Sequence, residues 1–136
     1  MPGLEIVRSI LTDAETVDAA VKFGKKLGKT VFVVKDTPGF VVNAVMIPYL
    51  LNAVRMLESG IATKENIDIG VVTGLSHPVG PLALADFFGL DVLYAIAISL
   101  YEDTKDPALN PPLLLKQMVK AGWLGRKTGK GFYEYP

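Results

Sequence analysis

One amide interrupts the longest apolar stretch of the chain. Residues 40–57 are almost wholly apolar, and Asn43 lies near their start. The polar residues of the predicted helix form a stripe that begins at Asn52, nine positions later, which at about 100° per residue is the opposite face. A buried amide without a partner costs roughly 1–3 kcal/mol, so a polar group should meet Asn43. That group is either a substrate oxygen or a nearby backbone carbonyl.

Few other side chains suit catalysis. The chain has no cysteine, which excludes disulfides, thiolate nucleophiles and cysteine metal sites. The single histidine, His77, excludes a multi-histidine metal site. His77 stands between Ser76 and Pro78 in a predicted turn, with no carboxylate at helical spacing on its side. We therefore expect a structural or dimer-contact histidine and not a general base.

The tail, residues 123–135, is punctuated by glycine and carries basic and aromatic residues. Its segment GRKTGK is one residue too short for a Walker A phosphate loop, and no helical pattern follows it. The 14 basic and 14 acidic residues balance, so neither nucleic acid nor a charged membrane surface is an expected partner. We expect the tail aromatics to pack against the helices.

Composition places the chain among proteins with a real core. Half of the 136 residues are hydrophobic, which suffices for one domain. No apolar run reaches the roughly 18 residues of a membrane span. The N-terminus lacks the charged and then apolar pattern of a signal peptide. With no cysteine, the sequence fits a reducing compartment, and we expect a cytoplasmic protein.

The first 34 residues predict a strand, a helix and a second strand. Residues 4–10 form a short apolar run, and residues 30–34 are β-branched and aromatic. Between them, Thr12 and Glu15 have the spacing of a capping box. Such a unit is right-handed if its strands are parallel neighbours. Two strands do not make a stable sheet, so this unit is either the end of a larger sheet or pairs with another chain.

The remaining residues have helical periodicity. The longest predicted helix runs from about Pro38 to Glu58, with Thr37 as its N-cap and Pro48 inside it. Four shorter helices are predicted. One is capped by Thr63 and ends before Gly74, and one covers residues 81–88. One is capped by Asp91 and reaches about Glu102, and the last spans roughly residues 112–121. The helices at 38–58 and 91–102 are apolar nearly all round, which favours a dimer.

Several motifs in this order resemble those of the 3-hydroxyacyl-CoA dehydrogenase family, in its C-terminal part. The motifs are KDTPGFVVN at 35–43, IPY at 47–49, ID at 67–68, PVGP at 78–81, Asp86, GLD at 89–91 and GRKTGKGFY at 125–133. The resemblance covers essentially the whole chain. It implies a mainly α fold class: a multi-helical C-terminal dimerisation domain, like that of 6-phosphogluconate dehydrogenase, at residues 37–136. Residues 1–36 would then be the last strand–helix–strand of a truncated, NAD-binding Rossmann domain.

The resemblance also implies roles for single residues. The family uses a His–Glu pair in which His is the general base, and Glu5 matches the glutamate in the segment LEIV. The family histidine lies about a dozen residues earlier, before this chain begins. From composition alone, Glu5 would be a surface acid at a strand end. Asn43 matches the substrate-side amide, and Lys127 matches a lysine that reaches the NAD pocket. The alternative for Lys127 is a solvated surface lysine.

The expected function follows from these matches. The chain resembles the C-terminal part of an NAD-dependent (S)-3-hydroxyacyl-CoA dehydrogenase, which interconverts 3-hydroxyacyl-CoA and 3-oxoacyl-CoA, with 3-hydroxybutyryl-CoA as the expected short-chain substrate. The cofactor NAD would bind mostly outside this chain, because no G-x-G-x-x-G motif follows a strand here. We expect a homodimer through the helical domain, and no turnover by the chain alone. The alternative is a non-catalytic helical module for dimerisation or assembly. Met1 is either a start or an internal methionine, and we favour truncation.

Overall fold

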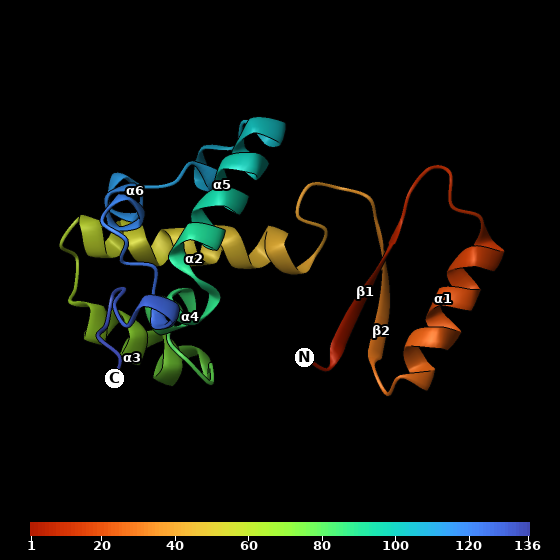
Figure 1. The fold of residues 1–136 in the computed structure, drawn as a ribbon, viewed down its shortest axis with the longest axis horizontal. Coiled ribbons are helices and arrows are strands. Elements are labelled where there is room, and N and C mark those ends of the chain that lie inside the picture. The colour runs from red at the N-terminus through yellow and green to blue at the C-terminus, as the bar shows by residue number, and fades with distance from the viewer. The chain divides into compact units, whose positions relative to one another are not determined.

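The computed structural model describes all 136 residues, which form two compact units, residues 1–44 and residues 45–136 (Figure 1). The first unit holds a parallel strand pair and one helix, and the second unit is helical. The chain is therefore mainly α, as expected. The boundary between the units lies beyond the domain boundary expected after residue 36. The assignment of residues 1–36 to a Rossmann domain stays a prediction.

The first unit consists of β1 (Gly3–Arg8), α1 (Ala14–Lys26) and β2 (Thr30–Lys35). The two strands are parallel, with Gly3 opposite Thr30 and Arg8 opposite Lys35, so the predicted strand–helix–strand order is confirmed. In this unit only Gly24 is buried. A Cβ on Gly24 would lie 2.7 Å from the Val31 side chain, so the glycine lets α1 pack closely on the sheet. The unit thus has a sheet but no apolar core of its own.

The capping box predicted for α1 is wrong by one residue. The N-cap is Asp13, whose carboxylate accepts a hydrogen bond of 2.7 Å from Thr16 N–H. The Thr12 hydroxyl accepts instead from Ser9 N–H at 3.1 Å, within the loop after β1. The pKa of Asp13 is lowered, chiefly by the hydrogen bond from the Thr16 backbone. Thr12 and Asp13 are both suitable N-cap residues, and the loop after β1 places Asp13 in the capping position.

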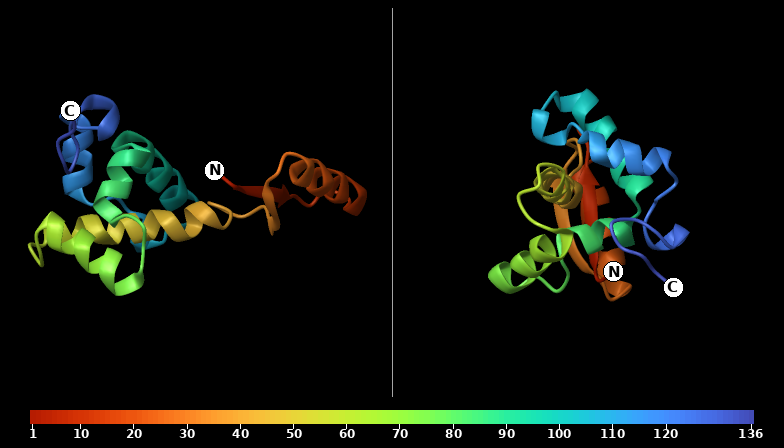
Figure 2. Two further views of the ribbon diagram at one scale, coloured as in Figure 1. Left: turned by 90° about the horizontal axis from the view of Figure 1, so that it is seen from below. Right: turned by 90° about the vertical axis from the view of Figure 1, so that its left-hand side faces the viewer.

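The second unit is built around α2 (Val42–Glu58), which begins in the first unit and continues into the second. The other helices are α3 (Lys64–Leu75), α4 (Pro81–Phe88), α5 (Leu90–Thr104) and α6 (Leu113–Lys120), with 3-10 turns η1 (Pro107–Leu109) and η2 (Arg126–Thr128) (Figure 2). All predicted helices are present. No single helix is long and apolar enough to cross a bilayer; only α4 and α5 together, bent by 95°, reach that length and apolarity.

The hydrophobic core lies wholly in the second unit. Four residues of α2 at i, i+3, i+4 and i+7 are completely buried and form one stripe. Facing residues from α4, α5 and α6 complete this core. The large aliphatic residues that are fully buried are Ile47, Leu50, Leu51, Val54, Leu82, Leu90, Leu93 and Leu115.

The polar stripe predicted on α2 holds a neighbouring loop in place. Arg55 Nη2 donates to the carbonyls of Ala108 and Asn110 at 2.9 and 2.7 Å. Glu58 Oε1 accepts from Leu114 N–H at 2.8 Å, at the first turn of α6. The stripe thus faces outward as predicted. Two of its residues, Arg55 and Glu58, also hold the segment 108–114 against α2.

The predicted start of α2 is wrong. The helix begins at Val42 and not at Pro38, because Gly39 and Phe40 have φ angles of 78° and 50°. Left-handed residues cannot continue a right-handed helix. The Thr37 hydroxyl lies 3.4 Å from the Lys35 carbonyl, to which it donates, so it does not cap the helix. The group that meets the start of α2 comes from β1.

Candidate functional site

Glu5 lies in the middle of β1, and its half-buried side chain meets the start of α2. Its Oε1 accepts hydrogen bonds from Val41 N–H at 2.9 Å and from Val42 N–H at 3.2 Å. The first N–H groups of a helix have no partner within the helix, and a carboxylate also suits the positive end of the helix dipole. One oxygen of Glu5 is therefore engaged by the backbone, and Oε2 remains for another donor.

Asn43 lies in the first turn of α2, one residue after Val42, and is half-buried. Glu5 and Asn43 line the same hollow, of about 460 Å³. The other lining residues are Met1, Pro2, Gly3, Leu4, Phe32 and Val42. An amide offers both a donor and an acceptor to a molecule in this hollow.

The structure therefore brings two of the three predicted site residues together. The wall of the hollow is mainly apolar, with one carboxylate and one amide. Few polar groups on an apolar wall are typical of small-molecule sites. The arrangement suits a ligand with an oxygen near the amide and a proton donor near the carboxylate. The catalytic roles of Glu5 and Asn43 stay predictions.

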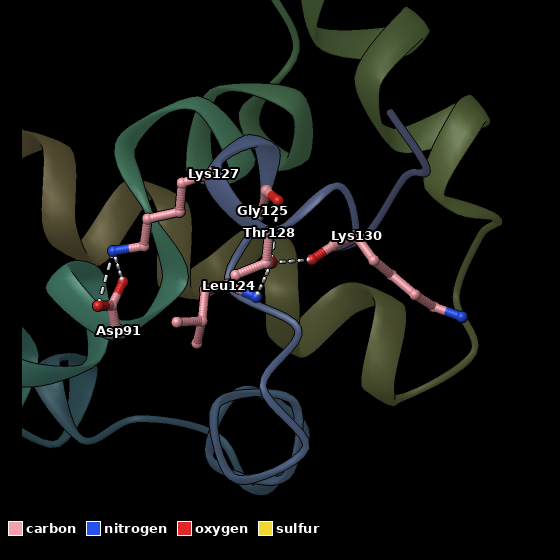
Figure 3. A network of polar contacts seen from close by, with 6 residues as sticks. All are labelled: Asp91, Leu124, Gly125, Lys127, Thr128 and Lys130. Atoms are coloured by element: carbon pink, nitrogen blue, oxygen red, sulfur yellow. Dashed lines mark hydrogen bonds and ion pairs between the residues drawn. The ribbon is translucent and has the colours of Figure 1, made fainter. Parts of the chain in front are cut away.

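Lys127, the third predicted site residue, lies in η2 and pairs with Asp91 in the first turn of α5 (Figure 3). Lys127 Nζ lies 2.7 Å from Asp91 Oδ2. Both side chains are partly exposed, at 47% and 38%. The hydrogen bond from Lys127 is the main cause that lowers the pKa of Asp91, against the opposing effect of burial. The prediction that Asp91 caps this helix is wrong, because α5 begins at Leu90 with Gly89 as its N-cap, and Asp91 pairs with Lys127 instead.

The turn that carries Lys127 is fixed by its neighbour Thr128. The Thr128 hydroxyl accepts from Leu124 N–H at 3.0 Å and lies 3.1 Å from the Lys130 carbonyl (Figure 3). Gly125, with a φ of 99°, begins the turn. The lysine is thus presented by an ordered turn. Its ammonium keeps donor capacity beyond what Asp91 uses, because an ammonium carries three hydrogens.

His77 contacts no carboxylate. Its Nδ1 lies 3.1 Å from Tyr49 Oη, and the two rings meet edge to face with centroids 5.6 Å apart. Burial raises the pKa of Tyr49, with the charge of Asp68 as the second cause. The pair joins the turn before α4 to α2. This contact agrees with the expected structural role and offers no base.

Two buried carboxylates have roles that sequence reasoning missed. Asp86 is 1% exposed and accepts from Phe132 N–H and Tyr133 N–H, each at 2.9 Å. Asp68 is 8% exposed and accepts from Leu82 N–H at 2.8 Å, at the start of α4. The adjacent Ala83 N–H donates to Asp68 at 3.0 Å. In the sequence both aspartates are motif residues within apolar helices, but nothing there indicates which groups they bind. Both are structural anchors, and they confirm that the tail packs on the helices.

Three comparisons relate the chain to known proteins. The family described as 3-hydroxyacyl-CoA dehydrogenase, C-terminal domain, matches residues 39–135. A 3-hydroxybutyryl-CoA dehydrogenase of Mycobacterium tuberculosis is 50% identical over 136 residues, which cover 99% of this chain and 48% of the relative. The mitochondrial hydroxyacyl-coenzyme A dehydrogenase of Sus scrofa is 41% identical over 136 residues, which cover 99% of this chain and 43% of the relative. The chain spans about half the length of these relatives.

Solved structures agree in fold. The crystal structure of M. tuberculosis FadB2 superposes with a TM-score of 0.97 at 50% identity, covering 100% of this chain and 48% of that one. The crystal structure of the (S)-3-hydroxybutyryl-CoA dehydrogenase PaaH1 of Ralstonia eutropha superposes with a TM-score of 0.96 at 44% identity. The match covers 100% of this chain and 48% of that one. Likeness at this identity extends over both units of the chain.

Proposed function

Because the chain belongs to the 3-hydroxyacyl-CoA dehydrogenase family, C-terminal domain, we propose that it is the substrate-binding and dimer-forming half of an NAD-dependent (S)-3-hydroxyacyl-CoA dehydrogenase. The proposed reaction interconverts 3-hydroxyacyl-CoA and 3-oxoacyl-CoA. The observation that carries this proposal is the hollow that Glu5 and Asn43 share. A second support is the similarity to 3-hydroxybutyryl-CoA dehydrogenases, from which we propose a short-chain substrate.

Oxidation of a secondary alcohol removes a hydride from carbon and a proton from oxygen. We propose that Asn43 donates its amide N–H to the 3-oxygen, an interaction that suits both the hydroxyl and the ketone because the amide is uncharged. The proton leaves to a histidine outside this chain, and the free Oε2 of Glu5 holds that imidazole and stabilises its charged form. NAD supplies the hydride acceptor when it is bound.

The strand–helix–strand unit itself does not fit a dinucleotide. The loop of residues 9–13 between β1 and α1 contains no glycine, and the start of α1 is already capped by the Asp13 carboxylate. A pyrophosphate there would meet a negative charge where a dinucleotide site offers free N–H groups. We therefore propose that NAD binds mostly outside this chain and that Lys127 is the contact this chain provides.

A homodimer through the second unit is also proposed. Several large apolar side chains of this unit are more than half exposed although its core is complete. They are Val45, Ile61, Ile69, Leu75, Phe87 and Leu113. Apolar surface of this kind is typical of an interface. Sedimentation that shows only monomer at micromolar concentration contradicts this part of the proposal. The cytoplasmic location stays a prediction, since relatives include mitochondrial enzymes.

The function is tested by reconstitution. The chain is joined to the part of the M. tuberculosis relative that it does not cover, and acetoacetyl-CoA reduction by NADH is measured beside the chain alone. We expect turnover only from the joined protein, and we expect Asn43→Ala to lower its kcat/KM about 100-fold. Asn66→Ala, which changes an exposed asparagine of the second unit, is the matched control. A joined protein that folds and binds acyl-CoA but turns nothing over favours the non-catalytic module instead.

A further inference from the structure

The start of α2 is capped from a distance. No side chain of the preceding turn meets its first N–H groups, since the Thr37 hydroxyl donates to Lys35 instead. The acceptor is Glu5 Oε1, which belongs to β1 and bonds both Val41 N–H and Val42 N–H. These two N–H groups immediately precede Asn43 in the chain. The carboxylate therefore holds the backbone one residue away from the proposed substrate amide.

Two other helices of the chain begin in the same way. The N-caps of α4 and α6 are Gly80 and Pro112, neither of which forms a side-chain cap. Asp68 accepts from the first turn of α4, and Glu58 accepts from the first turn of α6. A carboxylate from another element thus meets the start of three of the six helices, whereas α1 and α3 are capped by their own N-cap side chains.

The turn before α2 has an unusual backbone and leads directly into that contact. Gly39 and Phe40 both have positive φ angles, and Phe40 N–H donates to the Thr37 carbonyl at 2.9 Å. A large residue at positive φ is disfavoured and persists only where the surroundings hold it. Phe40 is 40% exposed, so core packing alone does not hold it. The bonds from Val41 and Val42 to Glu5 are the contacts that follow the turn directly.

We infer that Glu5 is a positioning residue for Asn43, in addition to the role toward the general base already proposed for it. Its Oε1 fixes the helix turn that presents the amide, and its Oε2 is left for the imidazole. One carboxylate thus sets the distance between the group that binds the substrate oxygen and the group that takes its proton. This inference rests on the proposed function for its catalytic meaning, and on the structure alone for the cap.

The cap is tested on the chain itself by amide hydrogen exchange and NMR. Glu5→Ala removes the acceptor, and we expect exchange at Val41 and Val42 to accelerate about tenfold or more, with a shift of the Asn43 side-chain amide signals. Glu5→Gln keeps an acceptor oxygen without the charge, so it should retain most of the protection. Glu15→Ala, an exposed glutamate of α1, is the control. Exchange within twofold of the parent chain in Glu5→Ala overturns the inference.

The catalytic consequence is tested by a double-mutant cycle in the joined enzyme. Because the base and the amide act on the same oxygen, their effects are non-additive even without the cap. Asn43→Ala is therefore also measured in Glu5→Gln, which disturbs the base but keeps the cap acceptor, and there the loss should stay close to that of the parent. We expect a loss of about 100-fold in the parent but less than about tenfold in Glu5→Ala, because the amide is already misplaced there. Equal losses in the parent and in Glu5→Ala overturn the coupling. Absence of any turnover in the parent joined enzyme refutes the proposed function, while the exchange measurement still decides the cap.

Discussion

The phenol of Tyr135 donates a hydrogen bond of 2.8 Å to the carboxylate of Asp86. Asp86 is nearly inaccessible to solvent and already accepts two backbone N–H groups of the tail. A single buried carboxylate on α4 therefore holds three donors from the last five residues of the chain. A Cβ on Gly131 would overlap this carboxylate, so the tail can pass only because residue 131 is glycine.

We expect Asp86→Ala to destabilise the chain strongly. The change leaves the N–H groups of Phe132 and Tyr133 without their acceptor in a buried place. Loss of about 3 kcal/mol or more in the free energy of unfolding is expected, since each unsatisfied buried group costs about 1–3 kcal/mol. Urea unfolding followed by circular dichroism measures it. Asp103→Ala, at an exposed position of α5, should change stability by less than about 0.5 kcal/mol. Equal effects of the two changes would contradict the anchor role.

Alkaline pH should weaken the same anchor. Burial, followed by the hydrogen bond to Asp86, raises the pKa of Tyr135 to about 12. An unfolded tyrosine titrates near 10, so the folded state holds the proton more tightly. The stability from Tyr135 is therefore complete below pH 10 and is lost as the pH rises through about 12. Burial also raises the pKa of Tyr133, which acts in the same direction.

The measurement is urea unfolding at several pH values between 9 and 12, a window set by the unfolded pKa of about 10 and the folded pKa of about 12. Tyr135→Phe should flatten the fall in stability over this range, while it lowers stability at pH 9 by the loss of one hydrogen bond. Tyr101→Phe is the control, because this half-buried tyrosine of α5 lies away from Asp86 and has Lys105 Nζ over its ring at 5.6 Å. A parent chain and a Tyr135→Phe variant with the same pH slope would show that this phenol does not carry the effect.

Element types followed from the sequence because they depend on local pattern. The i, i+3, i+4, i+7 stripe of α2 and the β-branched run of β2 are both readable from neighbours along the chain. The start of α2 was not readable, because its cap, Glu5, lies 36 residues before Val41. The start of α6 depends likewise on Glu58. Periodicity locates helices, but contacts between distant residues decide where they begin.

The candidate site was predictable only in part. The resemblance indicated Glu5 and Asn43, and the structure places both at one hollow. Helical spacing alone predicted which face of the helix Asn43 lies on. It could not predict that Glu5 of β1 lines the same hollow. The pair of Lys127 with Asp91 joins residues 36 apart, and no pattern in the sequence links them. Such pairs are set by how the tail folds back on α5.

Changing Lys127 should separate a structural role from a cofactor role. The pair with Asp91 is partly exposed, so its loss in Lys127→Ala should lower the free energy of unfolding by less than about 1 kcal/mol. If Lys127 contacts NAD, the KM for NADH of the joined enzyme should rise several-fold, with the KM for acetoacetyl-CoA unchanged. Asp91→Asn also breaks the ion pair but keeps the lysine, so it should leave the KM for NADH near that of the parent. Equal changes in both variants would assign Lys127 a structural role only.

Low pH should weaken the ion pair between Asp91 and Lys127. The pKa of Asp91 is lowered in the folded state, chiefly by the hydrogen bond from Lys127. Its contribution to stability is therefore present above the unfolded pKa, near 3.9, and is lost as the pH falls through the lower folded value. Unfolding curves of the parent chain and Asp91→Asn should converge below this range and diverge above it. A constant difference between them at all pH values would refute the link.

Replacement of glycine by alanine should change the free energy of unfolding in opposite directions at Gly80 and Gly70. A Cβ on Gly80 would overlap the side chain of Asp68, which holds the start of α4. Gly80→Ala should therefore destabilise the chain by about 1–3 kcal/mol, as overpacking does. Gly70 lies within α3 with nothing near its absent side chain, so Gly70→Ala should stabilise by about 0.5–1 kcal/mol. Thermal and urea unfolding of both variants measure the two effects. Stabilisation by Gly80→Ala would show that Asp68 yields easily and that its bonds to Leu82 and Ala83 matter little.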